Sequence, residues 1–154
     1  MAALLFRTAT AADLPAIIAM IADDQLGKAR DDASLPLDQR YLEAFAAIER
    51  DPNQRLVVTE EHGVVIGCMQ ITFIPGVSRR GAWRGQIESV RVARARRGGG
   101  IGTAMFEWAI AECHRRGCSL VQLFTDKSRS DAHRFYERLG FKASHEGMKL
   151  SLYP

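Results

Sequence analysis

The chain has 154 residues, of which 47% are apolar and 25% charged, and this composition excludes a largely disordered protein. No apolar run approaches the roughly 20 residues that a membrane-spanning helix needs. The N-terminus becomes polar too early, at Arg7, for a secretory signal. Three cysteines, an odd number, exclude a complete disulfide framework. We therefore expect reduced thiols, a cytoplasmic location and one domain spanning residues 1–154.

Apolar residues three or four positions apart predict a helix near the N-terminus. They are Leu14, Ile17, Ile18 and Ile21. Thr10 and Asp13 resemble a pair that caps the start of this helix. In chain order the first half should hold a strand over 4–8, this helix, a loop over 23–37 and a second helix over 38–50.

From residue 54 the pattern changes to β-branched runs separated by turn residues, which predicts strands. A hairpin should pair residues 56–59 with 64–66, and its second arm should extend up to residue 74. A loop over 76–82, a strand over 86–92, a helix over 101–116 and a strand over 120–125 should follow. The last elements should be a helix from Ser130 or Asp131 to Gly140 and closing strands over 141–143 and 148–152. This order predicts an α+β fold with a mixed, mostly antiparallel central sheet flanked by helices.

A glycine run, Arg97-Gly98-Gly99-Gly100-Ile101-Gly102, stands where a predicted strand passes into a predicted helix. Free amides at the first turn of a helix, together with the helix dipole, favour an anion. Glycines allow the backbone to approach a phosphate closely. Arg94, Arg96 and Arg97 can add charge-assisted contacts, so the run predicts a pyrophosphate site.

Spacing narrows the choice of pyrophosphate ligand. A dinucleotide fingerprint needs a third glycine where this chain has Thr103 or Met105. A P-loop needs a Gly-Lys-Ser/Thr ending, which is missing. What remains is Arg-x-x-Gly-x-Gly shortly after a strand.

Val92, Arg97, Gly100 and Gly102 resemble the acetyl-CoA signature of the GNAT superfamily of N-acetyltransferases. Downstream, Ala132-His133-Arg134-Phe135-Tyr136-Glu137-Arg138-Leu139-Gly140-Phe141 resembles the family's Ala-x-x-Phe-Tyr-x-x-Leu-Gly-Phe helix ending. The two motifs come in the family's order. The resemblance implies a GNAT-like fold and direct transfer of acetyl from acetyl-CoA to a primary amine in a ternary complex.

The resemblance also implies which residues bind the cofactor. They are Val90, Val92, Arg97, Gly98, Gly99, Gly100, Ile101, Gly102, Thr103 and Arg129. The backbone of residues 90–92 should pair with the pantetheine arm like an added strand. This chain departs from the family at three positions, with Arg94 where proline is common, Gly99 where a basic or polar residue is common, and Arg129 where asparagine is frequent.

Glu88 is the candidate general base. An alkyl amine is mostly charged at neutral pH and must lose a proton before it attacks. Several members of the family resemble this chain in carrying an acid on the same strand. Strict alternation would place Glu88 on the same face as Val90 and Val92, although a bulge would change that facing. The alternative is a surface glutamate in an ion pair.

Tyr136 is the candidate general acid. A phenol with a pKa near 10 can return a proton to a departing thiolate. The alternative is a core role, because Ala132, Phe135, Tyr136 and Leu139 form one apolar helical stripe.

Other constellations indicate no further chemistry. Cys113, His114 and Cys118 lack the paired spacing of a zinc site, so we expect no metal. The arginine-rich stretch alone would also suit nucleic acid, but no recognised nucleic-acid motif occurs, and we expect neither nucleic acid nor membrane as a partner. The acceptor, a small-molecule or peptide amine, should lie between the first two helices with their loop over 23–37 on one side and the loop over 75–85 on the other. The resemblance allows a homodimer. A non-catalytic acyl-CoA-binding or sensing module is the alternative function.

Overall fold

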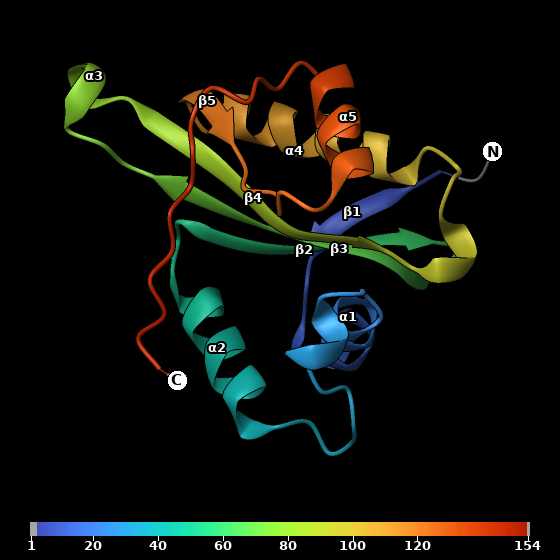
Figure 1. Ribbon diagram of the computed structural model, residues 1–154. Coiled ribbons are helices and arrows are strands. Elements are labelled where there is room, and N and C mark those ends of the chain that lie inside the picture. The colour runs from blue at the N-terminus through green and yellow to red at the C-terminus, as the bar shows by residue number, and fades with distance from the viewer. Residues whose placement is uncertain (1–2, 154) are drawn as a thin grey trace.

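The computed structural model describes residues 3–153 and contains one five-stranded sheet (Figure 1). In chain order and in sheet order the strands are β1 (Leu5–Thr8), β2 (Gln54–Glu61), β3 (Val64–Ile74), β4 (Trp83–Val92) and β5 (Cys118–Gln122). The first three pairings are antiparallel, and only β4 and β5 run parallel. The predicted mixed, mostly antiparallel α+β fold is confirmed.

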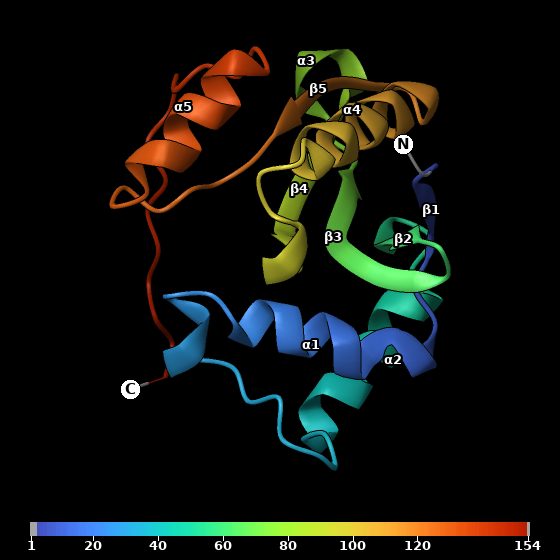
Figure 2. The ribbon, with the colours of Figure 1, turned by 90° about the vertical axis from the view of Figure 1, so that its right-hand side faces the viewer.

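The helices cover both faces of the sheet. They are α1 (Leu14–Ala22), α2 (Gln39–Arg50), α3 (Ser78–Gly81), α4 (Ile101–Arg115) and α5 (Ser130–Arg138), with short 3-10 turns at Ala11–Asp13, Gly27–Ala29 and Arg94–Arg96. Figure 2 shows α1 and α2 on one side of the sheet and α4 with α5 on the other. We call these the α1 face and the α4 face.

Each face has its own apolar core, as the alternation of strand side chains requires. On β2, Val57 joins the α4-face cluster and Val58 joins the α1-face cluster. The thiols divide in the same way, because Cys68 packs on the α1 face and Cys113 on the α4 face, both fully buried. Burial on both faces explains why the central strand β3 is mostly apolar, with the uncharged run 64–69 at its start.

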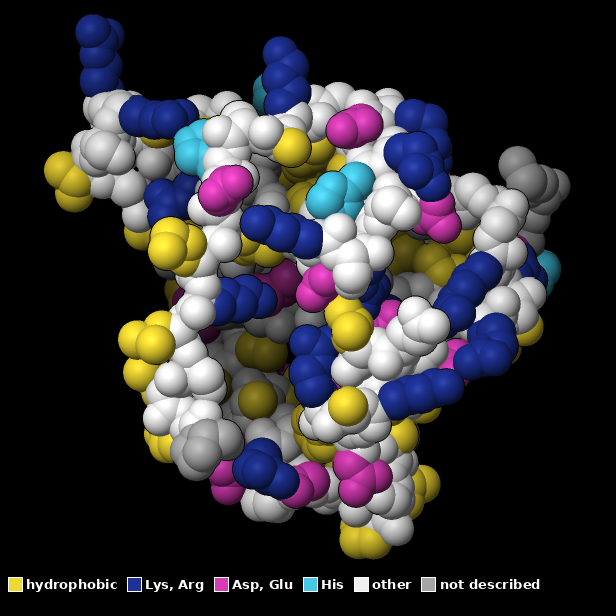
Figure 3. All heavy atoms as spheres, in the orientation of Figure 1, with side chains coloured by type: hydrophobic (Ala, Val, Ile, Leu, Met, Phe, Trp, Pro, Cys, Tyr) yellow, Lys and Arg dark blue, Asp and Glu magenta, His cyan; other side chains and the backbone are white. Residues whose placement is uncertain are grey.

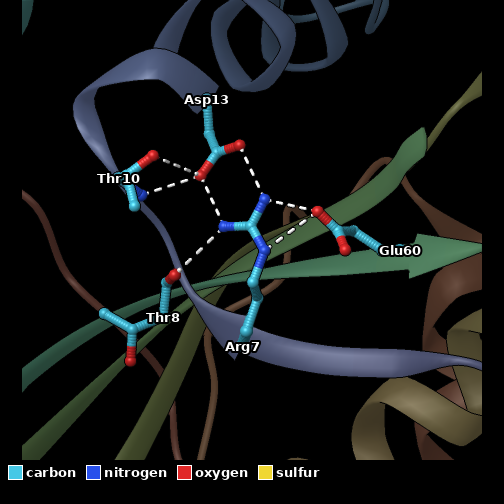
Figure 4. Close-up of polar contacts among 5 residues, drawn as sticks. All are labelled: Arg7, Thr8, Thr10, Asp13 and Glu60. Carbon is cyan, nitrogen blue, oxygen red and sulfur yellow. Dashed lines mark hydrogen bonds and ion pairs between the residues drawn. The ribbon is translucent and has the colours of Figure 1, made fainter. Parts of the chain in front are cut away.

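Arg7 ties the first strand to its neighbours (Figure 4). Its guanidinium donates to both carboxylate oxygens of Asp13, at 2.7 and 2.9 Å, and to Glu60 on β2. Asp13 Oδ2 also accepts from the backbone N–H of Thr10 at 2.7 Å, so the predicted Thr10–Asp13 capping pair is present. Hydrogen bonds from Arg7 lower the pKa of Asp13 to about 2.

Helix α4 lies unusually close to β4. A Cβ on Gly85 would come within 2.3 Å of Cys113 Sγ, so only glycine allows this spacing. The close approach fixes the end of α4 against the start of β4.

Two sequence predictions differ from the structure. Residues 141–143 and 148–152 form no strand, and the chain there is mostly exposed, because among residues 3–153 no backbone hydrogen bond joins these residues to the sheet. The loop predicted over 76–82 contains the single turn α3, in which Arg79 and Arg80 have positive φ. Within the described residues, no helix combines the length and apolarity needed to cross a membrane.

Candidate active site

The glycine run lies at the junction between β4 and α4, as predicted. Gly98 and Gly100 have φ values of 83° and 78°, a left-handed conformation that favours glycine. Gly100 is the residue before the first turn of α4, and no side chain caps that turn. The first intrahelical bond runs from Ala104 N–H to Gly100 O, which leaves the amides of residues 101–103 free to bind an anion.

A cavity of about 300 Å³ opens at this helix start. It is lined by Val92, Arg96, Arg97, Gly98, Gly100, Ile101, Gly102, Thr103 and Phe135. The predicted binding residue Gly99 is exposed and does not line it. Arg97 folds back over the strand end, where its Nε donates to Val92 O at 3.1 Å.

Strands β4 and β5 separate beside this cavity. Their pairing begins at Trp83 with Cys118 and ends at Gln86 with Gln122. In the described part of the chain, residues 87–92 therefore have a strand partner only on the β3 side. The result is a strip of unpaired backbone that runs directly to the α4 amides, suited to an extended ligand that carries a diphosphate.

A β-bulge interrupts β4 at this strip. Glu88 pairs with Gln70 and Arg91 with Cys68, so two residues of β4 lie opposite one of β3, and Ser89 has φ 54°. The bulge reverses the facing of the later residues of β4. Val90 and Val92 pack on the α4-face core, whereas Glu88 is exposed on the opposite face. The alternation that grouped Glu88 with Val90 and Val92 is therefore wrong.

A second cavity, of about 550 Å³, adjoins the same strip. Its lining holds five basic and two acidic side chains, and consists of Asp23, Asp24, Gln25, Lys28, Val90, Arg91, Val92, Arg94, Arg97 and Arg129. Figure 3 shows a separate hollow beside the C-terminal segment, with basic side chains near its edge; no described residue of that segment lines the 550 Å³ cavity.

Asp24 holds two arginines from distant elements at this cavity. Its carboxylate accepts from Arg129, which precedes α5, at 2.5 Å, and from Arg91 on β4 at 3.5 Å. Burial alone would raise the pKa of Asp24, but these two ion pairs outweigh it and lower the pKa. The Nε of Arg91 is buried and has no partner among the described residues. The lining of the cavity is thus predominantly cationic.

Tyr136 lies both in the core and beside these arginines. Its ring packs edge-to-face on Phe106, with centroids 5.5 Å apart. Burial raises the pKa of the Tyr136 hydroxyl, and the charges of Arg129 and Arg91 offset part of the rise. A phenol near its ordinary pKa or above stays protonated at neutral pH and can donate.

Sequence reasoning missed the group Asp24, Arg91 and Arg129 as a unit. The early aspartates and the arginine stretch are both visible in the sequence, but nothing local shows that they pair. Arg94 and Arg96, expected to contact phosphates, form ion pairs with Asp23 and Glu61.

One further expectation concerns the surroundings of the site. The loops over 23–37 and 75–85, expected to flank the acceptor together with the first two helices, lie at opposite ends of the molecule in Figures 1 and 2. Within residues 3–153, no cluster of three His, Cys, Asp or Glu side chains could hold a metal ion.

The sequence profile described as the Acetyltransferase (GNAT) family matches residues 19–141. The chain belongs to the GNAT acetyltransferase family. It is therefore an N-acetyltransferase, and enzymes of this family take the acetyl group from acetyl-CoA. The two sequence motifs that carried the resemblance both lie within the matched residues or at their end.

The chain is also similar to two named N-acetyltransferases and to one solved structure. Aminoalkylphosphonate N-acetyltransferase of Salmonella typhimurium is 35% identical over 107 residues, 70% of this chain and 69% of that one. Glucosamine 6-phosphate N-acetyltransferase of Trypanosoma brucei brucei is 33% identical over 58% of this chain and 59% of that one. A crystal structure described as a transcriptional regulator from Bacillus halodurans is 46% identical, with a TM-score of 0.94 over 97% of this chain and 100% of that one.

Proposed function

We propose that this GNAT enzyme acetylates the primary amine of a small molecule that carries a phosphonate or phosphate group. The observation that carries the proposal is the unpaired strip of β4, residues 87–92, which leads to the free amides of α4. The amine attacks directly while both substrates are bound.

The proposed acetyl-CoA-binding residues lie along that strip and at the start of α4. The diphosphate of acetyl-CoA would bind the amides of residues 98–103, with Arg97 beside it. The pantetheine arm would pair with the backbone at Val90 and Val92. Arg129, at the cavity rim, would contact the same arm.

Two groups would promote attack on the thioester. The side chain of Glu88 lies on the α1 face of β4, opposite to Val90 and Val92, where it can take a proton from the ammonium form of the acceptor. The bulge at Ser89 releases nearby β4 amides from the ladder, and one of them can hold the thioester oxygen. A carbon–nitrogen bond forms as the carbon–sulfur bond breaks.

Tyr136 would complete the step. Its hydroxyl donates a proton to the departing CoA thiolate and recovers one from solvent. Because Arg129 and Arg91 lie near the hydroxyl, their charges stabilise the tyrosinate that forms transiently.

The acceptor class rests on charge and on the relatives. Both curated relatives are named for acceptors that carry a phosphonate or phosphate. Five basic side chains against two acidic ones line the larger cavity, and the guanidinium groups among them are suited to bind phosphate. We also propose that the enzyme works in a reducing cytoplasm, where its three free cysteines stay reduced.

A second candidate role is acetyl-CoA-dependent regulation without transfer. It is favoured by one relative, 46% identical, which is described as a transcriptional regulator. A sensing module needs the cofactor strip but neither Glu88 nor Tyr136.

Thiol release from acetyl-CoA, measured over paired acceptors, tests both roles. The pairs are an aminoalkylphosphonate with the matching alkylamine, and glucosamine 6-phosphate with glucosamine. We expect kcat/KM to be at least about tenfold higher for the anionic member, the effect of roughly one well-placed ion pair. Equal rates within each pair would overturn the acceptor class. Calorimetric binding of acetyl-CoA without acceptor-dependent release would favour regulation.

A further inference from the structure

A row of uncharged polar side chains crosses the α1 face of the sheet. The residues that alternate with them along the strands pack in the α4-face core, so the row itself points to the opposite face. Pairing between the strands brings its members side by side. We call these five residues the polar row: Gln54 on β2, Gln70 and Thr72 on β3, Gln86 on β4 and Gln122 on β5.

Hydrogen bonds between neighbouring strands hold the polar row in place. Gln54 Oε1 accepts from Gln70 Nε2 at 2.9 Å and from Thr72 Oγ1 at 3.0 Å. Gln122 Nε2 donates to Gln86 Oε1 at 2.9 Å. A glutamine amide has two donor hydrogens and an oxygen that can accept twice. The row therefore keeps donors and acceptors that these contacts do not use.

The helices on this face leave the polar row accessible. The α1-face core, to which α1 and α2 contribute, instead covers the neighbouring Leu56, Val58 and Cys68. All five members of the row are only partly buried. Figures 1 and 2 show α1 and α2 below the sheet and the chain after α5 passing beside it, and Figure 3 shows a hollow beside that C-terminal segment. A ligand can therefore reach the row from solvent.

The candidate base lies at one end of this row. Glu88 pairs with Gln70 across the β3–β4 ladder and follows Gln86 by two residues, so the three share the α1 face. Beyond the bulge, β4 continues into the lining of the cavity of about 550 Å³, to which Arg91 belongs. Glu88 thus stands between a predominantly cationic cavity and a neutral, hydrogen-bonding surface.

We propose that the polar row binds a hydroxyl group of the acceptor, on the side of the amine away from the phosphate or phosphonate. The inference rests on the proposed function, in which the amine lies at Glu88 and the anion among the arginines of the cavity. A second substituent on the amine-bearing carbon then lies over the row, between Gln70 and Gln86. An apolar substituent would cover amides without hydrogen-bonding them, which is costly, whereas a hydroxyl both donates and accepts. The substrate class is therefore a hydroxylated amine with one anionic group.

Two acceptors that differ in one hydroxyl test the proposal without acetyl transfer. The first is serinol monophosphate, whose amine-bearing carbon carries a phosphate arm and a hydroxymethyl arm. The second is its deoxy analogue, with a methyl group in place of the hydroxymethyl group. Calorimetry with CoA in the cofactor site gives the dissociation constant of each. We expect the wild-type enzyme to bind serinol monophosphate about tenfold more tightly, the effect of one net hydrogen bond.

Substitutions in the row should remove that preference. Gln70→Leu and Gln86→Leu should each reduce it to about threefold, because the hydroxyl loses one of two partners, and the double variant should abolish it. Gln39→Leu, the same change at an exposed position on α2, is the matched control and should keep the tenfold preference.

The wild-type comparison decides the ligand class on the native chain. Equal affinity for the two acceptors, or binding of neither, would overturn the proposal. A tenfold preference retained in the double variant would overturn it as well. Serinol monophosphate that binds with the expected preference but is not acetylated would contradict the proposed function and leave the polar row as a binding site.

Discussion

Tyr136 illustrates how one side chain can serve packing and chemistry together. Phe106, Phe135 and Phe141 surround its ring in edge-to-face contacts, and such pairs fix orientation as well as adding stability. The hydroxyl, at the other end, lies near two guanidinium groups. The two interpretations left open by the sequence, core residue and acid, are therefore compatible.

Tyr136→Phe separates the two roles. We expect kcat to fall about 100-fold, the usual scale for a lost general acid, while the dissociation constant for acetyl-CoA changes less than about twofold because the ring and its packing remain. Burial raises the pKa of Tyr136, so the wild-type hydroxyl should stay protonated through neutral pH and kcat should show no decline there from its ionisation. Steady-state kinetics and calorimetry measure these quantities, and an unchanged kcat would remove Tyr136 from the acid role.

Glu88→Gln should cause a loss that depends on pH. At neutral pH the acceptor amine is mostly protonated and needs a base, so kcat/KM should fall about 100-fold. As pH rises toward the pKa of the amine, the deficit should shrink, because the acceptor is then neutral without help. Glu107→Gln, at an exposed position on α4, is the matched control and should follow wild type at every pH. A Glu88→Gln profile parallel to wild type would exclude Glu88 as the base.

At the scale of elements, the turn between β4 and α4 determines where a diphosphate can bind. Gly98 and Gly100 hold left-handed backbone on either side of Gly99, which does not. The loop therefore offers two positions where a methyl group should disturb the site and one where it should not.

Gly100→Ala and Gly99→Ala test that distinction. A left-handed alanine costs about 1 kcal/mol, and relief of that strain would shift the amides of the first turn, so we expect acetyl-CoA to bind Gly100→Ala about tenfold more weakly. For Gly99→Ala the nearest atom to the new methyl would lie 3.7 Å away, an ordinary contact, and binding should change less than about twofold. Equal weakening of binding in both variants would contradict the assignment of the anion site to the first turn of α4.

What the sequence predicted at this scale depended on how local each signal was. The helix over 101–115 and the glycine run were predicted correctly, because a helical repeat and a turn residue act over a few positions. The facing of Glu88 was left open, since strict alternation and a bulge place it on opposite faces. A bulge is decided by the register with β3, which no residue of β4 reveals. Residues 148–152 have the alternation of a strand, but alternation does not specify a partner. The group around Asp24 needed contacts between segments far apart in the chain.

For the whole molecule, Arg7 connects β1, the 3-10 turn before α1 and β2. Its side chain is 31% exposed and that of Asp13 9%, so the pair is shielded enough to affect stability. The folded pKa of Asp13, about 2, is below its ordinary value of 3.8. The contribution to stability is therefore present above about pH 4 and disappears as pH falls through about 2.

Asp13→Asn should lower the free energy of unfolding at neutral pH by about 2 kcal/mol, the linkage value of that depressed pKa. The deficit relative to wild type should shrink below about pH 4 as wild-type Asp13 takes up its proton. Urea unfolding at several pH values measures the loss of stability at neutral pH and its decrease at low pH, with Glu107→Gln again as the control. A deficit that stays constant from pH 7 to 2 would show that the hydrogen bonds, and not the charge, account for the effect.

The placement of the two buried thiols has a practical consequence. Burial raises the pKa of both Cys68 and Cys113 to about 12, so neither alkylates until its own layer opens, and the layers lie on opposite sides of the sheet. The alkylation rate of each thiol thus reports how often its own face of the protein opens locally. Comparing the alkylation rates of the two thiols with and without acetyl-CoA would show on which face the ligand suppresses local opening. The native cysteines serve as the probes, so no engineered label is needed.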